Sequence, residues 1–308
     1  MKIDLHSHTH YSDGHLSPQE LILRAHNMQL DALAITDHDT VAAIDEALAF
    51  QNTQKRHLSI IPGIELSTSW HGFDIHILGL NIDREDALFQ ERLAQQAAAR
   101  QERALIIAEK LAKCGLDDVY ESAARYAGKG QITRAHFARV MVEKGYVHNF
   151  DGAFRKYLGK GKRAHVAPKW ITIDEAIQWI HDAKGKAVLA HPGHYDLSAK
   201  WLRKLIVYFK QAGGDGMEVC HPHLAPDRQR QMATYAQEYQ LEASAGSDFH
   251  APGRWTELGR HLNIPEHLTP IWHDWQSIGQ EYAVNPQEIN NQDVIATDEN
   301  HKNKESLS

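Results

Sequence analysis

Cysteine is almost absent from this sequence, since only Cys114 and Cys220 occur in 308 residues. Two cysteines cannot build a disulfide framework, and they cannot supply the thiolate ligands of a structural zinc site or an iron–sulfur cluster. A metal site in this chain would therefore use nitrogen and oxygen ligands. The 22 histidines make such a site the first feature to look for.

Long apolar segments are also missing. No run approaches the roughly 18 residues of a membrane span, and the opening MKIDLHSH lacks the basic and apolar regions of a signal peptide. These absences predict a cytoplasmic protein that does not bind membranes. Nothing in the sequence indicates an obligate protein partner.

Positive charge is scarce overall but concentrated in one segment. The net charge of −7 argues against a protein that binds nucleic acids through its overall charge. Residues 94–165, however, carry 14 Lys and Arg against 7 Asp and Glu, a local net charge of +7. This segment could therefore face an anion.

Short β-like runs alternate with helical ones over most of the chain, a pattern typical of a β/α barrel or a doubly wound sheet. The pattern stops at a long helical stretch and then resumes. We expect a barrel formed by residues 1–86 and 165–284, interrupted by a helical insertion at residues 87–164. Residues 285–308 are polar and predict a disordered tail.

Residues of the types that bind metal ions follow the expected strands. In such folds the active site lies at the carboxyl ends of the strands. The first three strands end in His6 with His8, in Asp37-His38-Asp39 and in Glu65, and the fourth contains His76. Two strands after the insertion end in His191 and in Asp248 with His250. Residues two apart on an extended segment project from one face, so the first and last pairs each form half of a site. Asp13 follows the first strand in a Ser-Asp-Gly turn that could return its carboxylate to the same place.

The segments DLHSHTHYSDG, LAITDHDT, IPGIELS, HILGL, AVLAHPG and GSDFH together resemble the PHP (polymerase and histidinol phosphatase) family of metal-dependent phosphoesterases. This resemblance covers about residues 1–82 and 165–262. The insertion, with ITRAHFAR and FRKYLGKGKRAHVAPKW, more narrowly resembles the bacterial RNase AM branch. Members of that branch are described as 3′,5′-nucleoside bisphosphate phosphatases and 5′-to-3′ exoribonucleases. The family resemblance implies an α/β fold, a distorted (β/α)7 barrel, with a trinuclear metal centre.

The resemblance also implies which residues hold the ions. One ion would be held by His6, His8, Glu65 and Asp248, a second by Glu65 as a bridging carboxylate with His76 and His191, and a third by Asp13, His38 and His250. The residues expected to act in catalysis are Asp13, His38, Glu65, His191 and Asp248. Mn²⁺ is the favoured ion; Zn²⁺ and Fe²⁺ stay open, and six imidazoles make a centre of Mg²⁺ alone the least favoured. Such ions would acidify a bridging water and neutralise the phosphoryl oxygens, so no Ser or Cys nucleophile is needed.

Substrate selection is expected in the insertion. The candidates for binding a second phosphate are Arg100, Arg103, Arg134, His136 and His194, the last being three residues beyond His191. The basic run at residues 155–163 is a further candidate, and Tyr157 and Trp170 are candidates for stacking on a base.

Three functions stay open. The first is a phosphatase of nucleoside 3′,5′-bisphosphates, an exoribonuclease on short single-stranded RNA with a 5′ phosphate, or both. The second is a histidinol-phosphate phosphatase, whose small amine-bearing substrate needs no second anion site. The third is a noncatalytic PHP module that binds a partner, against which the complete ligand set counts.

Overall fold

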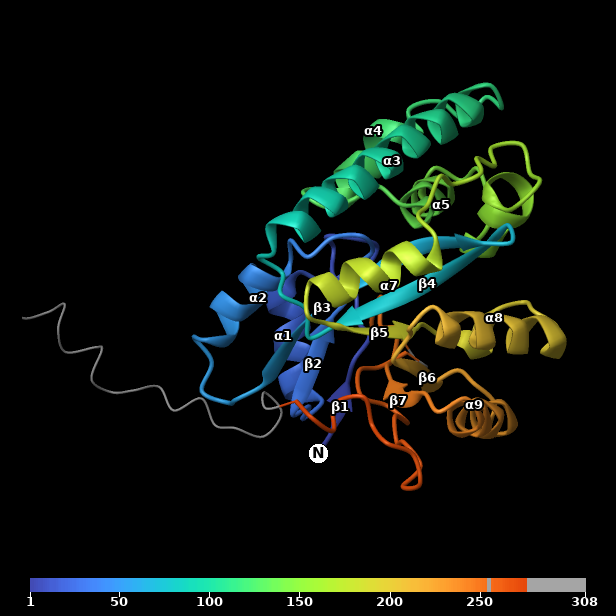
Figure 1. Ribbon diagram of the computed structural model, residues 1–308. Coiled ribbons are helices and arrows are strands. Elements are labelled where there is room, and N and C mark those ends of the chain that lie inside the picture. Colours follow the sequence, from blue (N-terminus) through green and yellow to red (C-terminus); the bar gives the residue numbers. More distant parts are fainter. Residues whose placement is uncertain (254–255, 276–308) are drawn as a thin grey trace, which may run out of the picture. The chain divides into compact units, whose positions relative to one another are not determined.

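In the computed structural model residues 1–253 and 256–275 are described, and they contain one seven-stranded sheet (Figure 1). The strands are β1 (Ile3–Asp4), β2 (Ala32–Ile35), β3 (Ser59–Trp70), β4 (Phe73–Leu80), β5 (Lys186–Leu189), β6 (Gly216–Cys220) and β7 (Glu242–Ala245). Their order in the sheet follows their order in the sequence. The expected tail at residues 285–308 lies outside the described residues, as does the end of the expected second barrel segment.

The sheet closes between its first and last strands. Just beyond β1, the Leu5 N–H donates to the Ala245 carbonyl at 3.1 Å, and the His8 N–H donates to the Phe249 carbonyl at 2.9 Å. Ser7 and Phe249 form a parallel bridge between these extensions. The α/β barrel expected from the sequence is thus confirmed, and its closure brings the two ends of the described chain together.

One strand breaks the parallel pattern. β4 pairs antiparallel with both β3 and β5, while the other neighbouring strands pair in parallel. β3 and β4 are joined by His71 and Gly72, whose φ angles of 47° and 77° suit the tight turn of a twisted hairpin. The expectation that the third strand ends at Glu65 is therefore wrong, because hairpin pairing extends β3 to Trp70 and leaves Glu65 in mid-strand.

Helices accompany the barrel strands and fill the segment between β4 and β5. The barrel helices are α1 (Pro18–Asn27), α2 (Ile44–Gln51), α7 (Ile173–Asp182), α8 (Ala199–Gln211), α9 (Pro226–Glu238) and the short 3₁₀ turn η2 (Pro192–His194). The insertion holds α3 (Ala87–Ala112), α4 (Val119–Ala127), α5 (Arg134–Glu143), α6 (Phe150–Ala153) and the π-helical turn η1 (Phe154–Leu158). Figure 1 shows α3, α4 and α5 gathered above the sheet, with α8 and α9 to the right of β5, β6 and β7. Within residues 1–253 and 256–275, no helix combines the length and apolar character needed to cross a membrane.

Two apolar cores support this arrangement. The larger packs the sheet against the barrel helices and includes the fully buried Leu33, Ile64 and Leu189. The smaller has its buried members between Ala104 and Ala164, so the insertion packs around a core of its own. A separately packed insertion can present its polar face to the barrel without disturbing the barrel core.

Candidate metal centre and substrate cavity

Glu65 lies at the centre of the predicted ligand set. One carboxylate oxygen, Oε1, is 2.8 Å from His76 Nδ1 and 2.9 Å from His191 Nε2. The other oxygen, Oε2, is 3.3 Å from the Nε2 atoms of both His6 and His8. Its position in mid-strand on β3, beside β4, makes these contacts possible, because His76 lies on the neighbouring strand.

The remaining predicted ligands surround this carboxylate. His38 Nδ1 is 3.1 Å from Glu65 Oε2, and Asp248 Oδ1 is 3.1 Å from His8 Nε2. Asp13 Oδ1 is 3.2 Å from His250 Nε2. All nine residues that the sequence singled out as metal ligands are therefore brought to one place by the barrel.

Three groups of these side chains have ligand atoms within 4.8 Å of one another: His6, His8, Glu65 and Asp248; His38, Glu65 and His76; and His8, Asp13, His38 and His250. The first group has the membership expected for the first ion. In the second, His38 takes a place expected for His191, which contacts Glu65 from outside the group. In the third, His8 joins the three expected residues, so the groups share side chains.

Several polar atoms in the cluster are buried and have no hydrogen-bond partner within residues 1–253 and 256–275, namely His6 Nε2, Asp13 Oδ1, His38 Nδ1 and Glu65 Oε2. A buried polar atom without a partner costs about 1–3 kcal/mol. Imidazole nitrogens and carboxylate oxygens that converge within 4.8 Å are also the donor set that transition-metal ions prefer. These residues fit divalent metal ions.

The electrostatics keep the acids of the cluster ionised. Burial raises the pKa of Asp13 and Asp248, but neighbouring imidazoles hold both pKa values well below the usual range: His38 and His250 beside Asp13, and His250 and His6 beside Asp248. Burial lowers the pKa of His38 to about 3, so its imidazole is neutral and can act as a ligand. For His250 burial is outweighed by Asp13 and Asp248, which raise its pKa to about 10 without bound metal. Metal binding would therefore displace protons from the cluster.

Glu218 on β6 orients two of the candidate ligands and was missed from the sequence. Its Oε1 accepts a hydrogen bond from His6 Nδ1 at 3.0 Å, and its Oε2 accepts one from the His191 backbone N–H at 2.5 Å. A donor hydrogen on Nδ1 leaves the His6 Nε2 lone pair free to face the cluster. The sequence signal was a single carboxylate inside the apolar strand GMEVC.

Asp37 and Asp39, which flank His38, are in none of the three ligand groups and instead accept hydrogen bonds from neighbouring residues. Asp37 accepts hydrogen bonds from the Thr9 N–H at 2.8 Å and from Ser12 Oγ at 2.6 Å, and so fixes the loop that carries Asp13. Asp39 accepts from Arg100 Nε at 2.5 Å. The sequence placed both in a ligand-type motif, and the structure gives both a supporting role.

Replacing Glu218 by Gln tests this orienting role. Because an amide nitrogen cannot accept a hydrogen bond, Gln can satisfy only one of the two donors from His6 and His191. We expect the Glu218→Gln variant to bind its metal ions about 10- to 100-fold more weakly, as for other residues that orient a ligand. Metal titration of activity measures this, with Glu238→Gln on exposed α9 as control. Equal metal affinity in the two variants would remove Glu218 from the site.

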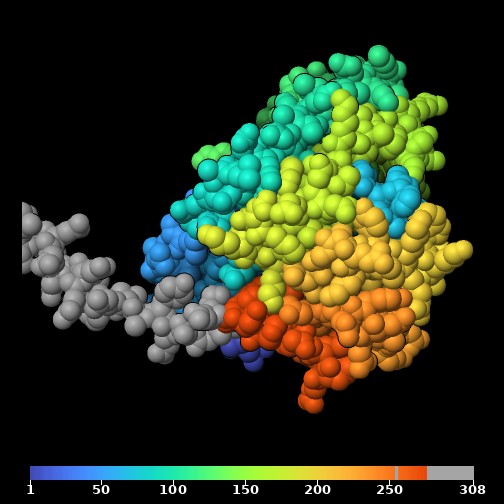
Figure 2. All heavy atoms as spheres, viewed as in Figure 1, coloured from blue at the N-terminus to red at the C-terminus, as the bar shows by residue number. Residues whose placement is uncertain are grey.

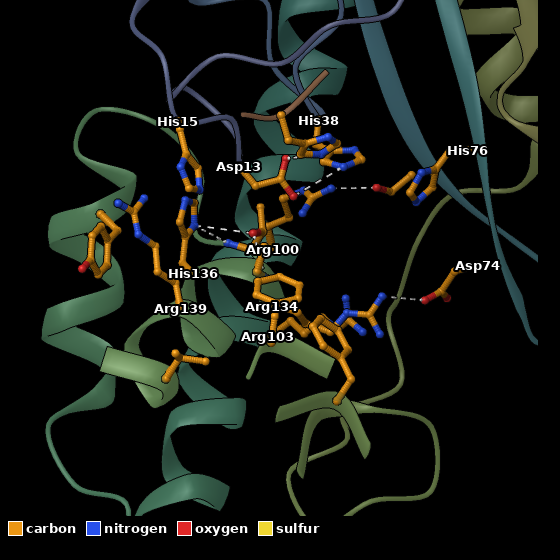
Figure 3. A pocket seen from close by; sticks show the side chains of 18 of the residues that line it. Asp13, His15, His38, Asp74, His76, Arg100, Arg103, Arg134, His136 and Arg139 are labelled. Atoms are coloured by element: carbon orange, nitrogen blue, oxygen red, sulfur yellow. Dashed lines mark hydrogen bonds and ion pairs between the residues drawn. The ribbon is translucent and has the colours of Figure 1, made fainter. Parts of the chain in front are cut away.

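A cavity of about 740 Å³ joins the cluster to the insertion. Asp13, His38, His76 and His250 line it at the cluster end. At the other end the lining residues from the insertion and its flanks include Arg100, Arg103, Arg134, His136, Arg139 and Trp170. Figure 3 shows Asp13 and His38 on one side of this cavity and Arg103 and Arg134 on the other.

Four of the five predicted phosphate-binding residues line this cavity. Arg100 is already engaged, because its Nε donates to Asp39 at 2.5 Å and its Nη2 to Ser67 Oγ at 2.7 Å. Arg103 donates from Nε to a backbone carbonyl, but its Nη2 is buried and has no partner in the part of the chain that the structure describes. Burial, and then the charge of Arg134, lower the pKa of Arg103 to about 10, so its guanidinium remains charged at neutral pH.

Arg134 and His136 begin α5 at the cavity wall. Arg134 Nη2 donates to Asp74 at 3.2 Å. His136 Nδ1 accepts from the Thr133 N–H at 3.0 Å, and burial lowers the His136 pKa to about 4. The neutral ring therefore carries its proton on Nε2, which can donate to an anion.

His194, the fifth predicted residue, is not among those that line the cavity in the described part of the chain. It is exposed on η2, and its Nε2 lies 2.9 Å from Nδ1 of His221. His221 follows β6 and was not predicted from the sequence. It is buried, and its Nε2 lies 4.0 Å from Asp248 Oδ2.

Of the two aromatic residues predicted to stack on a base, one lines the cavity and the other does not. Trp170 lines the cavity, with the guanidinium carbons of Arg100 and Arg103 at 5.0 and 5.2 Å from its ring centre. Tyr157 is buried in the core of the insertion and cannot stack on a base there. Phe150 and Phe154, which the sequence did not single out, line the cavity instead.

Comparison with known proteins agrees with this geometry. A family model described as "PHP domain" matches residues 4–186. The 5′-3′ exoribonuclease Rnm of Salmonella typhimurium is 48% identical over 89% of this chain and 93% of that protein. The 3′,5′-nucleoside bisphosphate phosphatase of Chromobacterium violaceum is 37% identical over 89% of this chain and 96% of that protein.

Among solved structures, a protein from Chromobacterium violaceum described as an amidohydrolase with bound sulfate and no metal superposes with a TM-score of 0.82. It is 38% identical and covers 88% of this chain and 95% of its own. The shared fold, the matched family model and the relatives that span nearly the whole chain show that this chain belongs to the PHP domain family.

Proposed function

We propose that this chain is a metal-dependent phosphoesterase that acts on nucleotides carrying two phosphates. It removes a phosphate from nucleoside 3′,5′-bisphosphates and releases nucleotides from the 5′ end of short 5′-phosphorylated single-stranded RNA. One observation carries the proposal: a single cavity is lined at one end by the candidate metal ligands and at the other by arginines, one of which has a buried Nη2 without a partner. The relatives named for these two activities support it.

We assign the nine ligands to three divalent ions, with Mn²⁺ favoured. The ions would be held by His6, His8, Glu65 and Asp248; by Glu65, His76 and His191; and by Asp13, His38 and His250. When bound, such ions lower the pKa of a water molecule and offset charge on the phosphoryl oxygens. The ionised Asp13, Glu65 and Asp248 supply the negative charge that retains the ions.

The other end of the cavity would hold the phosphate that is not cleaved. Arg103 offers a charged, buried N–H group without a partner, and Arg134 can turn part of its planar fork from Asp74 to a phosphate. Neutral His136 can donate from Nε2. Two anchored phosphates fix the nucleotide along the cavity, so that the scissile ester faces the candidate metal ligands.

This cavity disfavours the alternative substrate. Histidinol phosphate carries an amine, and the wall opposite the metal ligands presents Arg100, Arg103, Arg134 and Arg139. Cations placed there would repel the amine. A noncatalytic module would have no need for nine converging ligands or for a cavity that joins them to arginines.

A product assay with Mn²⁺ tests the proposed function. Adenosine 3′,5′-bisphosphate, histidinol phosphate and a 5′-phosphorylated oligoribonucleotide are incubated separately with the protein, and released phosphate and nucleotides are measured. We expect turnover of the first and third compounds. Turnover of histidinol phosphate alone would refute the proposal.

Arg134→Ala should separate binding of the second phosphate from the chemistry. Loss of a charged hydrogen bond of about 1.5–3 kcal/mol predicts a KM for adenosine 3′,5′-bisphosphate that is higher by about 10- to 100-fold, with little change in kcat. Adenosine 3′-monophosphate, which lacks the second phosphate, should show no such difference. Arg155→Ala is the matched control, since Arg155 is exposed and, among the described residues, does not line the cavity. Equal wild-type kinetics on mono- and bisphosphates would contradict this role of Arg134.

A further inference from the structure

Aromatic rings form a cluster at the tip of the β3–β4 hairpin, outside the cavity. Trp201 of α8 lies 5.6 Å from Trp70 and 5.9 Å from Phe73, measured between ring centres. His71, in the turn of the hairpin, lies 5.5 Å from Trp201. His71 and Trp201 are exposed, Trp201 to 37% of its surface, so the cluster has a face open to solvent.

Two exposed lysines lie over these rings. Lys204 Nζ is 4.7 Å from the ring centre of Trp201, and Lys160 Nζ is 5.6 Å from that of Phe73. Lys160 also donates to the Gly72 carbonyl at 2.9 Å, which ties the insertion to the hairpin tip. Figure 2 shows this tip (cyan) at the surface between the insertion (yellow-green) and α8 (gold).

The cluster lies at the end of a strand that also contributes residues to the substrate cavity. Asp74 follows Phe73 on β4, lines the cavity and accepts from Arg134. His76, the candidate ligand on the same strand, is three residues from Phe73, a span of about 10 Å at 3.3 Å per residue. The hairpin tip therefore lies a short distance along β4 from His76, on the strand that a chain continuing 3′ of the scissile ester would follow.

The cluster also contains an unsatisfied donor. Trp70 is 5% exposed, and its Nε1–H has no hydrogen-bond partner among the described residues. Buried donors of this kind are rare in folded proteins, and an oxygen of a bound ligand would satisfy it. This feature, unlike ring packing alone, points to a ligand.

We propose that His71, Phe73, Trp201, Lys160 and Lys204 form a platform for single-stranded RNA, which binds nucleotides on the 3′ side of the one held at the metal centre. Exposed rings interleaved with ammonium groups match the stacked bases and phosphates of a single strand. Lys160 and Lys204 form no salt bridge with another described residue, and phosphates would neutralise their charges, whereas an apolar protein surface would not. The inference rests on the proposed exoribonuclease activity and adds to it a site that favours longer chains.

Steady-state kinetics with 5′-phosphorylated oligoribonucleotides of two and eight nucleotides, and with adenosine 3′,5′-bisphosphate, test the platform. Trp201→Ala is expected to raise KM for the octamer by about 10- to 100-fold, as for loss of one base–ring stack, and to leave the bisphosphate kinetics unchanged. Trp201→Phe keeps a ring and should restore most of the octamer affinity. Lys204→Ala should raise the octamer KM by a smaller factor and make octamer binding less dependent on salt concentration, because one phosphate contact is lost.

Lys210→Ala is the matched control, since Lys210 is on the same helix but donates to the Gln240 carbonyl. Unchanged octamer KM in Trp201→Ala and Lys204→Ala would overturn the platform while the proposed function stands. A parallel rise in KM for the bisphosphate would also overturn it, because the effect would then be structural.

If the wild type turns over neither substrate, the proposed function fails. Fluorescence anisotropy of a labelled octamer, measured with the wild type and with Trp201→Ala, then still decides whether the platform binds RNA. Dimerisation of the wild type that Trp201→Ala abolishes, with octamer binding unchanged, would assign the surface to a second copy of the chain and overturn the proposal.

Discussion

Replacing Glu65 by Gln is expected to lower kcat/KM for adenosine 3′,5′-bisphosphate by about a thousandfold or more, equivalent to about 4 kcal/mol of transition-state stabilisation. Burial alone would raise the pKa of Glu65, but the imidazoles of His38, His76 and His6 outweigh burial and hold the pKa well below its usual range. The group is therefore a carboxylate. Its two oxygens lie within 3.3 Å of imidazole nitrogens from several strands. Gln has the same size but no charge, and it replaces one of these oxygens by an amide that cannot bind a cation.

The measurement pairs steady-state kinetics with metal content by mass spectrometry, so that loss of ions is seen beside loss of rate. Glu102→Gln, an exposed residue of α3 that pairs with Lys169, is the control for removal of one carboxylate charge. Circular dichroism establishes that the variant is folded, and Asp248→Ala repeats the test on a less buried ligand. Glu65→Gln protein with wild-type activity and metal content would contradict the assigned centre.

The metal ligands could be predicted because barrel topology and sequence position carry the same information. His6, His8, His38 and His191 each follow a short apolar strand, and a closed sheet turns such positions into neighbours. Nothing beyond strand order was needed to bring them together. The insertion arginines were predicted from a local excess of positive charge, which is more often only a solvated surface, but Arg100, Arg103 and Arg134 do line the cavity.

Other features could not be read from the sequence because they depend on pairing between distant segments. The antiparallel direction of β4 follows from a two-residue turn at His71 and Gly72, and it moved Glu65 to mid-strand. Glu218 looks like a stray charge in an apolar strand until its two donors are seen. Arg100 is indistinguishable from Arg103 by spacing, yet only Arg100 is neutralised by Asp39.

The two ends of the cavity also differ in how far the sequence alone could predict them. At the cluster end the residue types alone point to the chemistry, since few functions gather six imidazoles and three carboxylates. At the insertion end residue types are ambiguous, and the partner of each guanidinium decides whether it is available. The unpartnered Nη2 of Arg103 makes it, rather than Arg100, the stronger phosphate ligand.

Removal of divalent ions is expected to abolish activity and to lower thermal stability together. After exhaustive dialysis against a chelator, hydrolysis of adenosine 3′,5′-bisphosphate should fall by at least about a thousandfold, and Mn²⁺ should restore it. The cluster holds buried polar atoms without a hydrogen-bond partner among the described residues, including His6 Nε2 and Glu65 Oε2, and bound ions would satisfy them. Ions that bind the folded state alone stabilise it by about 4 kcal/mol at a free concentration a thousandfold above Kd, so the melting temperature should rise on addition.

The identity of the added ion sharpens this test. Six of the nine proposed ligands are imidazoles, which Mn²⁺, Fe²⁺ and Zn²⁺ accept more readily than Mg²⁺. Mg²⁺ at equal concentration should therefore restore less activity and a smaller rise in melting temperature than Mn²⁺. The Glu65→Gln variant should lose most of the Mn²⁺-dependent rise, because the carboxylate shared by two of the proposed sites is gone. Chelated protein that keeps full activity, with a melting temperature that Mn²⁺ leaves unchanged, would show that the converging imidazoles and carboxylates serve another purpose.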